Sequence, residues 1–182
     1  MKITPSDIAD VLIIEPQVFR DERGFFYESF NERRFEELTG LQPRFVQDNH
    51  SQSVRNVVRG LHYQVGQAAQ GKLIRVVAGA IFDVVVDLRR GSPSFGRAAC
   101  IELSADNQRQ LWIPPGFAHG FLVTSERADC LYKTTGYWSP TDERTLLWND
   151  PAVAIDWPLR GAPIVSAKDQ AGTPLAQAEV FP

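Results

Sequence analysis

The sequence predicts a mainly β protein, folded as a sandwich or a small barrel, and three observations favour this class. Short runs rich in β-branched and aromatic residues recur along the chain. Glycine, proline, asparagine and aspartate separate these runs, as is typical of turns between strands. Only one segment has the pattern and the boundaries of a helix, and many short strands with so few helices favour packed or closed sheets.

Ten segments are expected to be strands, because each is short, rich in β-formers and bounded by turn residues. In chain order they are Val11–Glu15, Gly24–Phe30, Arg44–Asn49, Val57–Gln64, Lys72–Ala78, Ala80–Leu88, Ala98–Leu103, Arg109–Ile113, Gly120–Thr124 and Ala128–Thr135. The chain has no internal repeat and no low-complexity tract, so these strands are not units of a repeat array.

The one expected helix follows Asn31, which is suited to cap its first turn. Phe35 and Leu38 lie on one side of this helix, and Gly40 can end it. Further along, Ala78-Gly79-Ala80 separates two runs rich in valine and isoleucine, which predicts a tight hairpin.

The last part of the chain differs in composition from the strand-rich part. After Trp148 it is rich in proline, which is disfavoured in the middle of sheets. We expect the segment of about residues 149–182 to pack on the barrel as loops and short helical turns. A chain of 182 residues is suited to a single domain, here residues 1–182.

The overall composition limits the classes of protein. Hydrophobic residues make up 43% and charged residues 23%, and the net charge of −3 gives no indication of nucleic-acid binding. No apolar stretch approaches the ~20 residues that would cross a membrane, and the start of the chain lacks the apolar core of a signal peptide. Cys100 and Cys130 lie in apolar runs and are expected to be buried free thiols. These features predict a cytoplasmic protein.

The expected strand Lys72–Ala78 contains an unusual lysine. Ile74 and Val76 are expected to point into the core, and Lys72 shares their face if the strand is regular. An ammonium at the inner mouth of a barrel is costly without a partner or a substrate. The alternative is that the strand starts later and that Lys72 is solvated.

The three histidines differ in their surroundings. His62 follows Arg59 by three residues on one expected strand, which brings a cation and an imidazole close together. His119 lies on an expected rigid turn, rich in proline and glycine, just before a strand. His50 is interpreted as a structural residue. A histidine between apolar residues is more often a hydrogen-bonded structural group than a catalyst, so neither His62 nor His119 is decisive alone.

The segments around two of these histidines resemble the two motifs of the cupin superfamily. Pro114-x-Gly116-x-x-His119 matches the start of the second motif, and Gly60–Gln64 falls where the first motif has His-x-His. A metal-binding cupin has histidine where Gln64 stands and a glutamate a few residues later, where this chain has Ala68 and Ala69. A zinc or iron site needs three or four converging ligands, so we expect a metal-independent protein.

The closer resemblance is to the dTDP-4-dehydrorhamnose 3,5-epimerase family, and it extends from about Asp21 to Asp169. Several ordered matches carry this resemblance, and together they are far more specific than any one alone. They are Asp21–Phe26, Gln47–Ser51, Arg59–Gln64, Gln70–Arg75, Ile81–Arg89, Pro114–Phe121 and Ser166–Asp169.

The resemblance implies a cupin-type jelly-roll barrel with a few short helices, and an isomerase activity. The family converts dTDP-4-dehydro-6-deoxy-D-glucose to dTDP-4-dehydro-L-rhamnose by inverting carbons 3 and 5, in dTDP-L-rhamnose biosynthesis, a branch of carbohydrate biosynthesis. Both carbons flank a C4 ketone, so the reaction needs a base, a group that holds the enolate oxygen, and an acid on the other face. No cofactor is required, and no G-x-G-x-x-G fingerprint occurs.

By resemblance, four residues carry the chemistry. His62 is the base, since an imidazole with a pKa near ~6.5 suits proton abstraction at neutral pH, and Asp169 orients it. Lys72 stabilises the enolate, and Tyr132 donates a proton to the opposite face. From their surroundings alone, Asp169 would be interpreted as a solvated loop carboxylate, and Tyr132 as a core ring with its hydroxyl at the rim.

The resemblance also implies a site for the dTDP group of the substrate. Arginine and lysine side chains are suited to bind the diphosphate. Amide side chains can bind sugar or phosphate oxygens, and aromatic side chains can stack on the thymine. The expected substrate-binding residues are Arg23, Phe26, Glu28, Gln47, Asn49, Arg59, His119, Trp138, Glu143 and Lys168.

The family forms homodimers in which an N-terminal strand helps to build the neighbour's sheet and site. The same is expected here, with Arg23, Phe26 and Glu28 acting across the interface. The alternation in Gly24–Phe30 is compatible with an edge strand that needs a partner.

Three other classes stay open. An epimerase that inverts only carbon 5 or only carbon 3 of a related dTDP-4-keto sugar would share His62, Lys72 and Asp169. A metal-dependent cupin enzyme is disfavoured by Gln64. A sugar-nucleotide-binding module without activity should have lost the base or the acid, and both are present.

Overall fold

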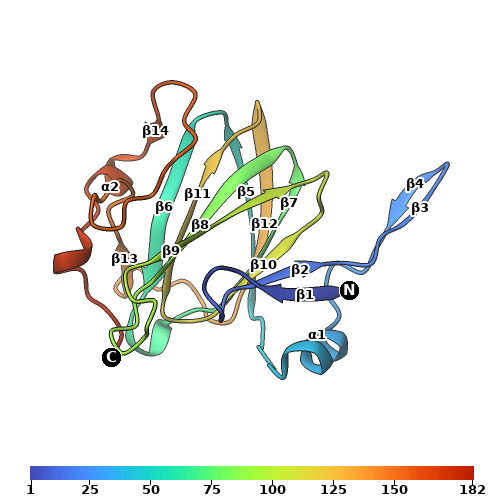
Figure 1. Cartoon of the computed structure of the whole chain (residues 1–182), viewed down its shortest axis with the longest axis horizontal. Coiled ribbons are helices and arrows are strands. Elements are labelled where there is room, and N and C mark those ends of the chain that lie inside the picture. The colour runs from blue at the N-terminus through green and yellow to red at the C-terminus, as the bar shows by residue number, and fades with distance from the viewer.

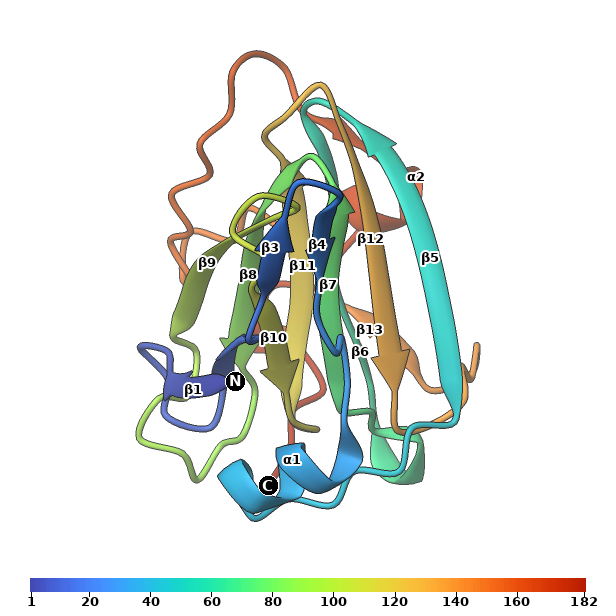
Figure 2. The same cartoon turned by 90° about the vertical axis from the view of Figure 1, so that its right-hand side faces the viewer.

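Two β-sheets that face each other form the body of the protein in the computed structural model, which describes residues 1–182 (Figures 1 and 2). The first sheet has the order β1-β2-β10-β7-β12-β5, and the second has the order β13-β6-β11-β8-β9, with β14 added in parallel to β6. The predicted class, mainly β with two packed sheets, is confirmed.

The bounds of the elements follow the sheets. The first sheet contains β1 (Lys2–Pro5), β2 (Leu12–Glu15), β10 (Gln110–Ile113), β7 (Lys72–Ala78), β12 (Arg127–Thr134) and β5 (Gln47–Val54). The second contains β13 (Glu143–Thr145), β6 (Val57–Gln64), β11 (Phe117–Val123), β8 (Ala80–Asp87), β9 (Ala98–Ser104) and β14 (Ile164–Val165). A separate hairpin is formed by β3 (Phe19–Asp21) and β4 (Gly24–Phe26). The helices are α1 (Glu32–Thr39) and α2 (Ala167–Gln170), with 3-10 turns at Gly66–Ala68 and Leu175–Gln177.

The core between the sheets follows from the alternation of side chains along each strand. Ile74 and Val76 of β7 and Val85 of β8 point inward and belong to one cluster of 16 buried residues. Each fully buried aliphatic side chain of this kind contributes about 1.5–3 kcal/mol to folding. Lys72 shares the face of Ile74 and Val76, as the alternation predicts, but it lies at the end of the strand where the core opens into a cavity.

Two further clusters cover the outer faces of the sheets. The C-terminal segment packs on the second sheet, where Trp157 and Phe181 contact a cluster that includes Leu61 and Val84. On the first sheet, Phe35 of α1 packs in another buried cluster. The expected caps of α1 are confirmed: the Asn31 side chain accepts a hydrogen bond from Arg34 N, and Gly40 ends the helix with φ of 71°.

The turn predicted at Ala78-Gly79-Ala80 is present, but the prediction that its two flanking strands pair as a hairpin is wrong. Gly79 does make the turn, with φ of 72°, and an added Cβ would collide with the main chain of Arg127. However, β7 and β8 belong to different sheets, so the turn carries the chain across the sandwich. Two valine-rich strands separated by one glycine have the same local pattern in both arrangements, which is why the sequence misleads here.

Several predicted boundaries are also wrong. The expected strand Gly24–Phe30 ends at Phe26 and pairs only within the β3–β4 hairpin, which projects from the body (Figure 1). β11 starts at Phe117, so His119 lies inside a strand and not on the turn before it. Cys100 is exposed, because its inward-facing neighbours on β9 leave it on the outer face.

Several short strands of the structure are not among the predicted segments. β1, β13 and β14 have two to four residues each, too few to give an alternating pattern. Neither α1 nor α2 has the length and the apolar composition that a membrane-spanning helix requires.

Candidate active site

A β-bulge in β6 brings two functional side chains to the same side of the sheet. In a regular strand, residues three apart point to opposite faces. Here His119 of β11 lies opposite His62, whereas Phe121 lies opposite Arg59, so β6 carries one extra residue between these pairs. As a result, both Arg59 and His62 face the cavity between the sheets.

The bulge depends on a close approach of two main chains. Gly60 has φ of 111°, and a Cβ at this position would lie 2.7 Å from the His119 carbonyl oxygen and 2.8 Å from Gly120 Cα. Any other residue would therefore be strained and would push the strands apart. The Gly60 N–H donates to Oδ2 of Asp169 at 3.1 Å, so the bulge also receives the carboxylate that lies behind His62.

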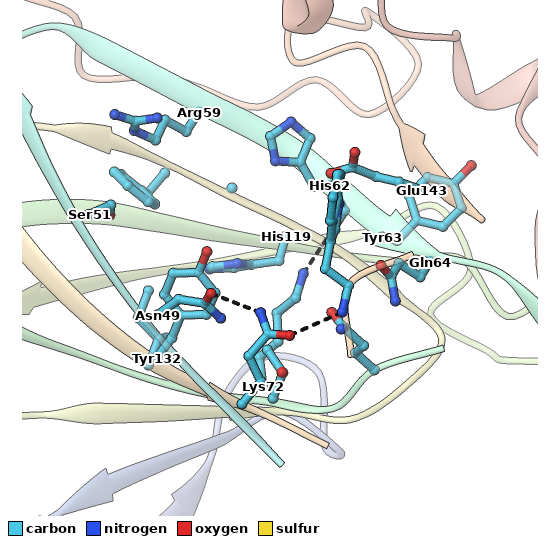
Figure 3. Close-up of a pocket in the computed structure, with 17 residues that line it drawn as sticks. Asn49, Ser51, Arg59, His62, Tyr63, Gln64, Lys72, His119, Tyr132 and Glu143 are labelled. Carbon is cyan, nitrogen blue, oxygen red and sulfur yellow. Dashed lines mark hydrogen bonds between the residues drawn. The ribbon is translucent and has the colours of Figure 1, made fainter. Parts of the chain in front are cut away.

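A cavity of about 400 Å³ opens between the sheets at this end of the molecule (Figure 3). It is bordered by side chains from β5, β6, β7, β11, β12 and β13. Nine of the residues predicted for the site border it, namely Gln47, Asn49, Arg59, His62, Lys72, His119, Tyr132, Trp138 and Glu143. In Figure 3, Arg59 and Ser51 lie toward one end of the cavity, and Glu143 and Gln64 toward the other.

A short contact joins His62 and Asp169, with 2.6 Å between His62 Nε2 and Asp169 Oδ1. Asp169 comes from α2 and is 3% exposed. Burial raises the pKa of its carboxyl, but the hydrogen bonds from His62 and the Gly60 N–H outweigh burial and hold the pKa below its usual value. An ionised carboxylate only accepts, so His62 donates from Nε2 and its Nδ1 is left as the basic atom.

Lys72 borders the cavity from the first sheet. Its Nζ donates to the main-chain oxygen of His62 at 3.2 Å. Burial lowers the pKa of this ammonium to about 8, although the negative charges of Asp83 and Glu143 oppose the shift. Lys72 is therefore mainly charged at neutral pH and has only a carbonyl as a hydrogen-bond partner, so two donors are free for a ligand.

Tyr132 lies on β12, in the sheet opposite His62. Burial raises the pKa of its phenol, so the hydroxyl keeps its proton at neutral pH. Ser51, on the neighbouring strand, has a buried hydroxyl without a hydrogen-bond partner, and it borders the same cavity. A buried unpaired hydroxyl in a cavity is suited to a polar group of a ligand.

The carboxylate that pairs with His119 is not among the predicted site residues. Asp83 on β8 is fully buried, and its two oxygens lie 3.0 and 2.9 Å from His119 Nε2. The signal was present, since a carboxylate between Phe82 and Val84 in an apolar strand requires a partner. The identity of that partner depends on the pairing of β8 with β11, which no local pattern contains.

The end of the cavity near β13 contains a lysine–glutamate ion pair. Lys168 Nζ lies 2.6 Å from Glu143 Oε2. Burial raises the pKa of the Glu143 carboxyl, but the bond from Lys168 outweighs it and the pKa is lowered. Trp138 is 59% exposed at this end and offers an open aromatic face.

Three predicted site residues lie away from the cavity. Arg23 and Phe26 are exposed on the β3–β4 hairpin, and Glu28 follows it. His50, interpreted as structural, points away from the cavity on β5 and lies 3.0 Å from Asp129 of β12.

The arrangement of possible metal ligands is sparse. No group of three or more histidine, cysteine, aspartate and glutamate side chains is arranged to hold a metal ion. Gln64, which stands where a metal-binding cupin has histidine, forms hydrogen bonds with main-chain groups.

The sandwich and its cavity define an enzyme of the cupin type that moves protons, because a paired imidazole, an ammonium and a phenol surround one ligand-sized space. The comparisons with known proteins agree. A family model for dTDP-4-dehydrorhamnose 3,5-epimerase matches residues 5–177, and the chain belongs to the dTDP-4-dehydrorhamnose 3,5-epimerase family.

Individual relatives cover nearly the whole chain. The dTDP-4-dehydrorhamnose 3,5-epimerase of Pseudomonas aeruginosa is 59% identical over 182 residues, covering 100% of both chains. The crystal structure of the dTDP-6-deoxy-D-glucose-3,5-epimerase of Legionella pneumophila in complex with dTDP-4-keto-L-rhamnose matches with a TM-score of 0.94 and 52% identity, covering 98% of this chain and 94% of that one. A dTDP-4-dehydrorhamnose 3-epimerase of Streptomyces niveus is 39% identical over 178 residues, covering 98% of this chain and 86% of that one.

Proposed function

We propose that this isomerase inverts carbons 3 and 5 of dTDP-4-dehydro-6-deoxy-D-glucose, giving dTDP-4-dehydro-L-rhamnose for dTDP-L-rhamnose biosynthesis. One observation carries the assignment of residues. His62 and Tyr132 border one cavity from opposite sheets, so a sugar ring between them has a base on one face and an acid on the other. Inversion at a carbon requires this arrangement, because the proton must leave one face and return on the other.

The first half of each inversion is proton abstraction. Nδ1 of His62 takes the proton from the carbon beside the C4 ketone, and the C–H electron pair forms the enolate. Asp169 stabilises the imidazolium and fixes the orientation of the ring. Lys72 holds the developing negative charge on the C4 oxygen, and such a contact contributes about 3 kcal/mol to stabilising the transition state.

The second half is protonation of the enolate carbon from the other side. The phenol of Tyr132 gives its proton, and the raised pKa supports this role because the hydroxyl is protonated before the step. The phenolate then regains a proton from solvent, and His62 releases its own. The cycle ends with both groups in their initial states, so the same pair can serve carbon 3 and carbon 5.

Deuterium exchange tests the proposed reaction. The chelator-treated protein is incubated in D2O with dTDP-4-dehydro-6-deoxy-D-glucose, and NMR follows exchange at both carbons. Exchange at both without added metal is expected. Exchange at one carbon only would assign a single epimerase, such as the Streptomyces niveus relative, and a strict requirement for added metal would favour a metal-dependent cupin. No exchange would refute the proposal.

Tyr132→Phe separates the two halves of the reaction. This variant keeps the base, so exchange of substrate protons should persist, while net inversion falls by about a hundred-fold because the acid is missing. An unchanged yield of inverted product would remove Tyr132 from this role.

The nucleotide is proposed to occupy the end of the cavity near β13. Trp138 stacks on the thymine, Glu143 and Lys168 lie beside it, and Arg59 is suited to the diphosphate. Gln47, Asn49 and His119 offer polar groups to the sugar and diphosphate. The exposure of Trp138 and the presence of an ion pair at this end support this orientation.

We further propose a homodimer in which the β3–β4 hairpin of one subunit completes the site of the other. The hairpin projects from the body with Phe25 and Phe26 exposed by 58% and 67%, a state that favours a partner surface. Arg23 and Glu28 could then reach a diphosphate and a nucleotide that they do not approach within their own subunit.

Mixing two damaged variants tests this arrangement. Arg23→Ala lacks the hairpin charge, and His62→Ala lacks the base. If the hairpin acts in trans, a dimer of the two different variants has one site with both wild-type groups. Random mixing should therefore restore activity at about one quarter of all sites, and this activity is measured with substrate below its KM. Failure to regain activity, or a monomer in analytical ultracentrifugation, would refute the proposal.

The single domain and the cytoplasmic location are proposals as well. Packing of Trp157 and Phe181 on the second sheet supports one cooperative unit over residues 1–182, which predicts a single calorimetric transition. Cys100 and Cys130 are free thiols, which is typical of a reducing compartment, and cell fractionation checks the location.

A further inference from the structure

Gln64 borders the active-site cavity, but its amide group is already occupied. The residue lies at the end of β6 and is 5% exposed. Its Nε2 donates to the carbonyl oxygens of Ala68 at 2.7 Å and Tyr137 at 3.1 Å, and its Oε1 accepts from the Ser139 N–H at 2.7 Å. Both amide hydrogens are used, so Gln64 has no donor left for a substrate.

Two of these three bonds flank Trp138. Tyr137 and Ser139 are its neighbours in the chain, and the Trp138 N–H itself donates to Oε1 of Gln47 at 3.1 Å. This segment lies between the end of β12 and the start of β13, so it has no strand partner. Its main-chain groups must find partners elsewhere, and the side chains of three glutamines, Gln47, Gln64 and Gln70, bind four of these groups.

Gln64 also connects this segment to the other wall of the cavity. Ala68 belongs to the 3-10 turn that precedes Lys72 and β7. Through one amide, Gln64 therefore fixes the distance between the turn before β7 and the segment that carries Trp138. In a metal-binding cupin, a histidine at this position would point at a metal, whereas here the side chain joins two pieces of main chain.

We propose that Gln64 is a positioning residue that holds Trp138 at the mouth of the cavity, and that it thereby sets the affinity for the nucleotide base without taking part in proton transfer. The inference rests on the proposed function, because it takes Trp138 to stack on thymine. It concerns binding and not chemistry, since Gln64 has no free donor and its side chain makes no hydrogen bond to His62, Lys72 or Tyr132.

The first test is Gln64→Leu, which has a similar volume but removes all three hydrogen bonds. The dissociation constant of dTDP and the KM of the dTDP-sugar should rise about ten-fold, the size of one weakened base–aromatic stacking contact. The kcat should stay within about two-fold of wild type. A lower kcat at an unchanged KM would overturn the proposal.

Asn107→Ala is a matched control. Asn107 also makes three hydrogen bonds with main-chain groups, to Glu102, Ser104 and Arg109, but in the turn between β9 and β10. It lies outside the cavity, so its loss should lower the melting temperature without raising the KM. An equal rise of KM in this control would show that the effect of Gln64→Leu is one of general stability, and would overturn the proposal.

A double-mutant cycle with Trp138→Ala shows whether Gln64 acts through Trp138. Trp138→Ala alone should raise the KM, and adding Gln64→Leu should raise it no further, because the positioned group is already absent. Additive effects would mean that Gln64 acts independently of Trp138, and the proposal would fail.

A second variant and the activity of the wild type distinguish a failure of this proposal from a failure of the proposed function. If Gln64→Leu does not fold, Gln64→Met provides an unbranched side chain without an amide, and the same rise in KM is expected. Wild-type protein that fails to turn over the dTDP-sugar would refute the proposed function itself. An active wild type together with an unchanged KM in Gln64→Met would refute only the role of Gln64.

Discussion

Two histidine–aspartate pairs lie on neighbouring strands, and they differ in almost every other respect. His62 and His119 are register partners on β6 and β11. The His62 side chain is 31% exposed toward the cavity, and its carboxylate comes from a helix 107 residues away. The His119 side chain is 9% exposed, and its carboxylate, Asp83, comes from the adjacent strand and is fully buried.

The contacts of the two carboxylates explain why the pairs suit different tasks. Asp169 gives one oxygen to His62 and the other to the Gly60 N–H, so the imidazole is held at one point and its second nitrogen is available. Asp83 directs both oxygens at a single nitrogen of His119. The more exposed pair is suited to exchange a proton with a ligand, whereas the buried pair holds the His119 ring in one orientation at the border of the cavity. Under the proposed function, the same two residue types thus give a proton-carrying pair at His62 and a fixed polar group at His119.

His62→Ala is the strongest test of this difference. Proton exchange at both carbons should fall by about a thousand-fold or more, because the general base is lost. Binding of dTDP, measured by calorimetry, should change by less than about two-fold. Normal turnover in this variant would show that the exposed pair is not the proton carrier.

Asparagine at each carboxylate position compares the pairs directly. Asp169→Asn should lower kcat by about a thousand-fold while the protein stays folded, since the amide no longer holds the productive tautomer. Asp83→Asn should instead lower the free energy of unfolding by about 2 kcal/mol, because an amide is a weaker acceptor than a carboxylate for the buried hydrogen bond with His119. Urea denaturation and initial rates, measured on both variants, separate the two outcomes. The comparison fails if both variants lose the same property.

The pH dependence of kcat sharpens the role of Asp83. Lys72 has a pKa of about 8, so its ammonium loses the proton as the pH rises through this value, and kcat should fall on the alkaline side. The charge of Asp83 raises the pKa of Lys72. Asp83→Asn should therefore move the alkaline decline to lower pH, and Lys72→Gln should remove the decline while lowering kcat throughout. A decline that stays in place in both variants would contradict this assignment.

The smallest effect is expected at the third pair, His50 and Asp129. It has the same two residue types at 3.0 Å, but it lies on the outer face of the first sheet with the His50 side chain 58% exposed. His50→Ala should leave kcat within about two-fold of wild type, because an exposed pair is screened by solvent. A large loss of activity would mean that the outer face of this sheet contributes to the site.

The sequence predicts much of this site, but unevenly. The alternation along β7 correctly places Lys72 on the inward face, and the motif around His62 marks the right strand. The joint access of Arg59 and His62 to one cavity depends on the bulge at Gly60, which is a property of two paired strands. Asp83 was missed for the same reason, since its partner is chosen by the pairing of β8 with β11 and not by any local pattern.

The fold, like the site, can be predicted from the sequence only in part. Strand identity follows from local composition, and α1 begins and ends where Asn31 and Gly40 predict. Which strands pair is decided by packing over long sequence separations, so the turn at Gly79 could be predicted but its crossing between sheets could not. Very short strands such as β14 owe their conformation to a partner strand, and their own residues give little signal.

The origin of Asp169 has a consequence for the order in which the protein matures. Every strand of the two sheets precedes Asp169 in the chain, and synthesis on the ribosome proceeds from the N-terminus. A nascent chain that has already released β6 and β11 holds His62 without the carboxylate that orients it. Under the proposed function, competence for epimerisation is thus acquired only once Asp169 has been synthesised, later than every strand of the two sheets.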